Sequence, residues 1–301
     1  MTERRPPPRL IVNADDLGLC AEVNAGILRA HREGIVTAAS LLATGRGFED
    51  AVLRLHAAPR LDVGVHLAFV AEPALSGAGN TLTCPGGRLP PSAGAFARRW
   101  LAGRIRGEDL ETEARLQIER IRAAGLRPSH LDSHQHVHLL PGVFERILDL
   151  AARFGIETVR LPAERLPRRG VPAARLFRLP GLLALRVLCA RARRLPRPPA
   201  APRFAGFLDG GCLTEERLIA LLSGLEGGTT TELMCHPGLS PSMPEVAAWG
   251  YRHEEELRAL TSARVRALVA RRGIRLCGFR GGDGSAAAGE DQVMAHPVEG
   301  R

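Results

Sequence analysis

The chain has 301 residues, of which 45% are hydrophobic and 24% charged, a composition that fits a soluble globular protein with a sizeable core. It excludes a fibrous protein, a mostly disordered chain and a disulfide-stabilised scaffold. The formal net charge is +9 and every basic residue is arginine, but residues 160–203 hold twelve arginines and a single acid, Glu164. The positive charge therefore belongs to one segment, which argues against nucleic-acid binding by the chain as a whole.

The cysteines and the apolar segments indicate where the protein resides. The six cysteines are irregularly spaced without a C-x-x-C pair, and the first ten residues, MTERRPPPRL, are charged and proline-rich rather than a signal sequence. The most apolar window, residues 181–190, is short and contains Arg186, so we expect no transmembrane helix. These features predict reduced thiols and a cytoplasmic location.

Buried strands and amphipathic helices alternate in the first part of the chain. Residues 9–14 are a short apolar run that predicts a strand ending at Asp15 and Asp16. A helix is expected over residues 21–33. The pattern then predicts a strand over 37–42, a helix over 48–57 and a strand over 61–70.

Two segments interrupt this alternation. Residues 71–105 are rich in glycine, proline and serine and predict an inserted loop region, and residues 162–203 also break the rhythm. The remaining expected elements are helices over 108–124, 143–154, 214–223 and 253–272, strands over 129–134, 158–161, 231–234 and 274–277, and a disordered tail from about residue 281.

Polar side chains collect at the predicted strand ends. Alternating strands and helices predict an α/β fold with a parallel sheet, in which functional residues gather at the carboxyl ends of the strands. Those ends carry Asp15 and Asp16, His66, the run from His130 to His138, and Cys235 with His236. Carboxylates and imidazoles from several strand ends are typical of a metal site.

Each signal alone has an ordinary structural explanation. An Asp pair after a strand often caps a helix, and a single histidine such as His66 often lies in a core with its hydrogen bonds satisfied. The run from His130 to His138 is more specific, because its four histidines and Asp132 cannot all be buried without partners. A mixed Asp/His set leaves open positions on a metal for water and substrate, which fits hydrolysis of an amide or ester.

Five motifs resemble the YdjC-like carbohydrate deacetylases, which include the chitooligosaccharide deacetylases. They are LIVNADDLGL at 10–19, EVNAGILRAHREGIVTAASL at 22–41, GVHL at 64–67, SHLDSHQHVH at 129–138 and ELMCHPG at 232–238. Residues 260–276 are also similar to the last helix and strand of that family. The sequence departs from the family at Leu17, where phenylalanine is common, and over residues 162–203, which match no part of it.

The resemblance implies a distorted (β/α) TIM-like barrel, a single domain over about residues 1–280 with insertions at 71–105 and 162–203. It also implies a divalent metal. Magnesium is usual in the family, although two imidazoles are unusual ligands for so hard an ion, and an Asp/His/His set also suits zinc or another first-row ion. By motif, the metal ligands are Asp16, His66 and His134, the general base is Asp15, and the general acid is His236.

Four more residues match family positions that support these groups or face the substrate: His130, Asp132, His136 and His138. The implied reaction is removal of acetyl from an N-acetylated amino sugar by metal-activated water. Two alternatives stay open, a deacetylase of a lipid-linked amino sugar such as a glucosaminyl hopanoid and a non-catalytic sugar-binding barrel. A binder alone would not need all five of the matched catalytic and metal residues. The family also allows a homodimer.

The arginine-rich segment has several interpretations. The sequence predicts a basic amphipathic helix over residues 182–194, with leucines on one side and arginines on the other. Leu183 and Val187 lie on the side of the arginines. It is an ordinary surface helix or lid, a site for anionic groups of the substrate, or a peripheral membrane contact through residues 178–194. Nucleic acid fits least, because stacking aromatics are scarce.

Overall fold

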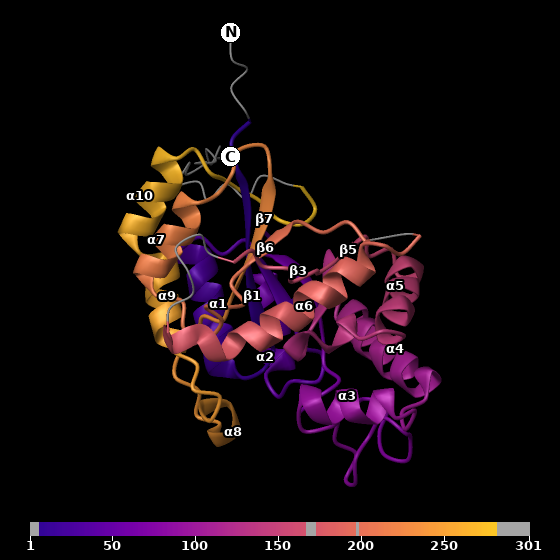
Figure 1. Cartoon of the computed structure of the whole chain (residues 1–301). Coiled ribbons are helices and arrows are strands. Elements are labelled where there is room, and N and C mark those ends of the chain that lie inside the picture. Colours follow the sequence, from indigo (N-terminus) through magenta and orange to yellow (C-terminus); the bar gives the residue numbers. More distant parts are fainter. Residues whose placement is uncertain (1–5, 167–172, 197–198, 282–301) are drawn as a thin grey trace, which may run out of the picture.

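A single parallel sheet organises the part of the chain that the structure describes, residues 6–166, 173–196 and 199–281 of a computed structural model (Figure 1). The strand order is β5-β4-β3-β2-β1-β7-β6, and β8 pairs with the start of β1. The strands are β1 (Arg9–Leu17), β2 (Ala38–Leu41), β3 (Asp62–Leu67), β4 (His130–Ser133), β5 (Thr158–Val159), β6 (Arg203–Ala205), β7 (Thr230–Cys235) and β8 (Arg275–Leu276).

The sheet curls until its two edges almost meet. One isolated parallel bridge, between Thr158 of β5 and Ala200, joins one edge strand to the segment that precedes β6 at the other edge. All ladders among the described strands are parallel. The expected α/β class and the distorted barrel are therefore confirmed, with seven strands around the curl and the closure reduced to a single bridge.

Helices cover the outside of the curled sheet (Figure 1). Their apolar faces pack on the strands in one large core of aliphatic side chains. The α-helices are α1 (Ala21–Glu33), α2 (Phe48–His56), α3 (Ala93–Leu101), α4 (Gly107–Ala123), α5 (Val143–Arg153), α6 (Leu179–Ala192), α7 (Glu215–Ser223), α8 (Pro244–Ala247), α9 (His253–Thr261) and α10 (Ala263–Arg271), and two 3₁₀ helices are η1 (His134–Leu139) and η2 (Ala173–Arg178).

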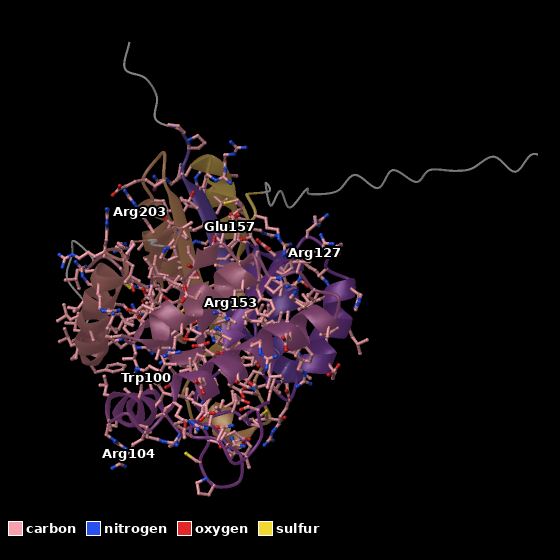
Figure 2. All side chains as sticks on the ribbon, turned by 90° about the vertical axis from the view of Figure 1, so that its right-hand side faces the viewer. Trp100, Arg104, Arg127, Arg153, Glu157 and Arg203 are labelled. Atoms are coloured by element: carbon pink, nitrogen blue, oxygen red, sulfur yellow. The ribbon has the colours of Figure 1, made fainter. Side chains whose placement is uncertain are left out.

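The segment predicted as an inserted loop contains helix α3. Ser92 starts it by accepting a hydrogen bond from the Ala95 amide, and Phe96 is fully buried against Phe69 with ring centroids 5.9 Å apart. The indole of Trp100, labelled in Figure 2, donates to the Pro141 carbonyl at 2.9 Å. The glycine and proline content concealed these anchors, so the loop prediction was wrong for residues 93–101.

Other boundaries also differ from the prediction. The helix expected over 253–272 is two helices, because the Ser262 hydroxyl accepts from the amides of Arg264 and Val265 and caps a new helix. The short elements β6 and α8 were not predicted. Most of the predicted tail lies outside the described residues. None of the helices in the described ranges is both long and apolar enough to cross a bilayer.

Candidate metal and catalytic site

A bulge at the end of β1 brings two adjacent aspartates to the same side of the sheet. In a regular strand Asp15 and Asp16 would point to opposite faces. The register with β2 shifts by one residue between Ala14 and Leu17, and Asp16 has φ of +66°, in the left-handed region. Both carboxylates are buried at the end of the strand as a result.

Asp16 joins two histidines from neighbouring strand ends. Its Oδ1 lies 3.3 Å from Nε2 of His66 on β3 and 3.0 Å from Nδ1 of His134, which follows β4. One ligand atom from each of the three buried side chains falls within 4.8 Å of the others. The three residues that the resemblance identified as metal ligands therefore form one compact group.

The surroundings of this group suit a divalent cation. The Nδ1 of His66 lies 2.7 Å from Oδ1 of Asp132, which directs Nε2 of the same ring toward Asp16. A histidine held between a carboxylate and a metal position is a common arrangement at metal sites. Burial opposes protonation of His66, but Asp132 and Asp16 raise its pKa to about 10. The negative charge of these two carboxylates, which favours protonation of the ring, would equally stabilise a bound cation.

The pKa of Asp16 follows the same balance. Burial acts to raise it, but His134 and His66 outweigh the burial and hold the pKa well below its usual range. The carboxylate is therefore ionised and available to a metal at neutral pH.

Two left-handed residues shape the turn after β4. Gln135 and His136 both have φ of +56°, an unusual conformation for residues with a side chain. They place His134 beside Asp16 and turn His136 into the cavity described below. His136 lies between the rings of Phe204 and Phe207, with centroids 6.2 Å and 5.9 Å away.

The other two histidines of the run support the site from inside the fold. His130 stacks on Phe279 at 3.8 Å between centroids and lies 3.1 Å from the Ser40 hydroxyl. His138 contacts the Ser133 hydroxyl at 2.7 Å and the Arg160 carbonyl at 3.0 Å. Neither of them lines the cavity, so of the four supporting positions only His136 faces it.

Arg160 is the main residue that the sequence analysis missed. It is fully buried at the end of the predicted strand over 158–161 and contacts three carboxylates. Its two terminal nitrogens lie 2.6 and 2.7 Å from the oxygens of Asp15, one of them also 2.7 Å from Asp132, and Nε donates to Glu232 at 2.6 Å. An arginine within an apolar strand sequence needs buried acids as partners, and this signal could have identified it.

His236 enters the site from the loop after β7. Its backbone amide donates to Glu256 at 2.5 Å, and its carbonyl accepts from His253 at 2.9 Å. The loop lies directly on α1, where a Cβ at Gly26 would come within 2.3 Å of the Gly238 backbone. Only glycine permits this close approach, which fixes the loop beside the aspartates.

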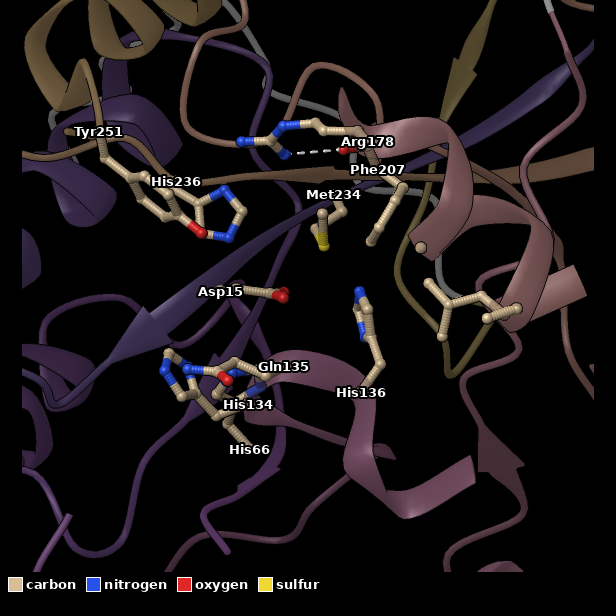
Figure 3. Close-up of a pocket in the computed structure, with 14 residues that line it drawn as sticks. Asp15, His66, His134, Gln135, His136, Arg178, Phe207, Met234, His236 and Tyr251 are labelled. Atoms are coloured by element: carbon tan, nitrogen blue, oxygen red, sulfur yellow. Dashed lines mark hydrogen bonds between the residues drawn. The ribbon is translucent and has the colours of Figure 1, made fainter. Parts of the chain in front are cut away.

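The site opens into one cavity of about 370 Å³. Figure 3 shows the Asp15 carboxylate pointing into it, with His66 and His134 on one side and His236 with Tyr251 on another. Its remaining lining comes from Gln135, His136, Arg178, Gly181, Ala184, Leu185, Phe207, Gly210 and Met234. Four of these residues, Arg178 to Leu185, belong to η2 and α6, so the segment that matched no family motif forms part of the wall.

We expect Asp132→Asn to weaken metal binding by 10- to 100-fold. The asparagine cannot accept from His66, Ser40 and Arg160 together, so the His66 ring loses its fixed orientation. Calorimetric titration of metal-stripped protein measures the effect, with the exposed Asp149→Asn as control. Equal affinity in both variants would remove Asp132 from its supporting role.

A second prediction concerns His138 and pH. Burial lowers its pKa to about 4 from an ordinary value near 6.5, so between these values the unfolded chain binds a proton that the folded protein does not. The contribution of neutral His138 to the free energy of unfolding is therefore complete above pH 6.5 and is lost as pH falls toward 4. The gap in unfolding free energy between wild type and His138→Gln should therefore narrow by up to about 1.4 kcal/mol per pH unit below pH 6.5. Denaturant unfolding from pH 7.5 to 4.5 measures it, with exposed His56→Gln as control, and a constant gap would contradict it.

The chain is similar over most of its length to a single family of known proteins. A sequence profile of the YdjC-like proteins matches residues 9–271. The chain is 35% identical over 277 residues to a carbohydrate deacetylase of Geobacillus stearothermophilus, covering 91% of this chain and 98% of that protein. It is 32% identical to a carbohydrate deacetylase of Homo sapiens, covering 91% and 90%, and 30% identical to a chitooligosaccharide deacetylase of Salmonella paratyphi B, covering 88% and 96%.

A solved structure supports the fold independently. A protein of Enterococcus faecalis V583 superposes with a TM-score of 0.68 at 24% sequence identity, covering 91% of this chain and 98% of that one. The profile match spans most of the chain, and the relatives are matched over nearly their full lengths. The chain belongs to the YdjC-like protein family.

Proposed function

We propose that this protein is a metal-dependent carbohydrate deacetylase that hydrolyses the acetamide of an N-acetylated amino sugar. The observation that carries the proposal is the convergence of Asp16, His66 and His134 with Asp15 and His236 on one cavity. The names of the relatives, carbohydrate deacetylase and chitooligosaccharide deacetylase, support the same reaction. A divalent cation bound by Asp16, His66 and His134 would polarise the acetamide carbonyl and make water a stronger nucleophile.

In this proposal Asp15 is the general base. Its Oδ1 accepts hydrogen bonds from Asn13 and Arg160, whereas among the residues that the structure describes its Oδ2 accepts only from Arg160 and keeps capacity for a proton. Arg160 fixes the carboxylate in the cavity wall, so it is a positioning residue. Asp15 then takes the proton of the attacking water as the bond to the carbonyl carbon forms.

His236 is proposed as the general acid. Burial lowers its pKa to about 4, so the ring is neutral before substrate binds. Among the described residues its buried Nδ1 has no hydrogen-bond partner. We propose that the ring takes up a proton from solvent as negative charge develops on the substrate, and that it passes this proton to the amine nitrogen as the C–N bond breaks.

The metal is proposed from the donor set. Two imidazoles and one carboxylate suit zinc, manganese or cobalt, and magnesium, the ion that the resemblance implies, is the other candidate. We expect Asp16→Asn and His134→Ala to lose both metal binding and activity, because each removes one of three ligands.

The decisive experiment measures acetate released from N,N'-diacetylchitobiose and longer chitooligosaccharides. Metal-stripped protein is assayed with magnesium, zinc, manganese or cobalt added back, and metal content is determined on the same samples. Metal-dependent acetate release supports the proposal. Bound metal without acetate release would reject these sugars as substrates and favour an amino sugar on a different carrier, whereas no metal binding would favour the sugar-binding alternative.

Location and assembly remain part of the proposal. We propose a reducing, cytoplasmic setting, which the buried free thiols Cys20, Cys189 and Cys235 support. Burial raises the pKa of Cys20 to about 11 and that of Cys189 to about 12, so neither is a reactive thiolate. A homodimer is the remaining expectation from the family, and sedimentation measures it.

A further inference from the structure

The helix that covers the candidate site is apolar on two faces. Toward the barrel, α6 buries Leu182, Leu185, Cys189 and Ala192. Away from it, Leu183 is 52% exposed and Val187 is 70% exposed. These two side chains are four residues apart and so share one outward face of the helix.

The exposed apolar side chains are concentrated on this segment. Eight large hydrophobic residues are exposed in the described part of the chain, and four of them lie between residues 176 and 187. The other two are Leu176 and Phe177 of η2, directly before α6, exposed by 51% and 74%. Single exposed leucines are ordinary on protein surfaces, but a group of four on one short segment marks an interaction surface.

Arginines flank this apolar surface. Arg186, Arg193 and Arg194 are exposed, and no carboxylate pairs with any of them within the ranges that the structure covers, although Arg186 donates to the Glu164 backbone carbonyl at 3.2 Å. Arg191 is different, because it pairs with Glu145 of α5. The single acid of residues 160–203, Glu164, is buried, so it does not reduce the positive charge of the surface.

We propose that the outward face of η2 and α6 is a docking surface for an anionic lipid bilayer. An apolar stripe with arginines beside it matches the boundary between acyl chains and acidic headgroups. Two copies of the chain joined by this face would bring the unpaired arginines of both together, which disfavours a dimer through it. The sequence interpretation as a peripheral membrane contact thereby gains a defined surface of Leu176, Phe177, Leu183 and Val187.

The same helix connects this surface to the cavity. Gly181, Ala184 and Leu185 of α6 line the cavity, while Leu183 and Val187 on the same helix are exposed. Docking would place the cavity wall next to the lipid headgroups. Resting on the proposed function, this position suits an amino sugar presented at a membrane surface rather than one free in solution.

Vesicle flotation of the full chain tests the docking surface without depending on enzymatic activity. Vesicles of phosphatidylcholine alone are compared with vesicles that contain phosphatidylglycerol, at low and high salt. We expect binding only to the anionic vesicles, weakened at least tenfold by high salt. Leu183→Ser with Val187→Ser should lower binding at least tenfold, and Arg193→Gln with Arg194→Gln about 25-fold, at about fivefold per arginine.

Matched controls come from exposed residues on other helices. Leu53→Ser with Leu101→Ser removes two leucines that are at least as exposed as Leu183 and Val187, 73% and 70%, and should leave binding unchanged. Thermal unfolding of each variant confirms that it is folded, and acetate release from soluble chitooligosaccharides should be unchanged in Leu183→Ser with Val187→Ser. No binding by the wild type, or equal loss in both leucine pairs, overturns the proposal. If the wild type sediments as a dimer and does not bind vesicles, and Leu183→Ser with Val187→Ser sediments as a monomer, the surface belongs to a second copy of the chain.

Discussion

Asp15→Asn should bind metal as tightly as the wild type and lose about a thousandfold in kcat. General-base catalysis by a positioned carboxylate contributes rate factors of this size, and an amide cannot accept the proton of water. Metal affinity should be retained, because Asp16, His66 and His134 form the ligand group without Asp15. The measurement is acetate release alongside metal titration of the same preparation.

The exposed Asp149→Asn serves as the control for this substitution. Asparagine nearly preserves the shape of the side chain, and Arg160 still has Asp132 and Glu232 as partners, so the fold should survive. Full activity in Asp15→Asn would end its assignment as the base. Loss of metal together with activity would mean that Asp15 is itself a ligand, for which its place near His66 and Asp132 gives a geometric reason.

Arg160→Met should destabilise the protein by roughly 3–5 kcal/mol at pH 7.5. Removal of one partner from a buried ion pair leaves an uncompensated charge, and here three carboxylates lose the same cation. Burial already raises the pKa of Glu232 to about 7 although Arg160 opposes it. Without the guanidinium, these acids would have to be protonated or to remain as buried unpaired charges.

The pH dependence separates this cause from simple loss of packing. Acids whose folded pKa rises above the unfolded value bind protons in the native state, so their unfavourable contribution grows as pH rises and shrinks as pH falls. The loss in free energy of unfolding caused by Arg160→Met should therefore be smaller at pH 5.5 than at pH 7.5, as measured by denaturant unfolding. Arg160→Lys keeps a charge but not the paired contacts, so an intermediate loss is expected. Arg153→Met, on the surface of α5 in Figure 2, is the control, and a deficit independent of pH would refute the electrostatic explanation.

The run from His130 to His138 shows how far a sequence pattern carries. Its density of imidazoles indicated a functional strand end, and motif resemblance separated His134 from its neighbours as the predicted ligand. Only the structure shows that the other three histidines have different surroundings. His136 lines the cavity, His130 stacks on Phe279 and His138 forms a hydrogen bond with Ser133. Two consecutive left-handed residues, Gln135 and His136, shape the turn that carries His136, whereas the partner of His130 comes from a segment distant in sequence.

In the arginine-rich segment the sequence predicts one face of the helix, and the tertiary structure decides the other. Its hydrophobic spacing predicts the buried face of α6, but the same spacing places Leu183 and Val187 among the arginines of the opposite face. Only the packing of α6 beside the cavity leaves them exposed as an apolar surface. Charge content alone also could not distinguish the paired Arg191 from the unpaired arginines beside it.

What the sequence alone determined is local or repeated along the chain. The alternation of apolar runs and amphipathic helices specified the parallel α/β class, and acids and histidines at strand ends predicted where the candidate site would lie. What only the tertiary structure decided involves residues distant in sequence. The bulge that turns Asp15 and Asp16 to one side requires the register with β2, and the partnership of Arg160 with Asp15 spans 145 positions. Such contacts depend on how the strands curl together, and no local propensity encodes that arrangement.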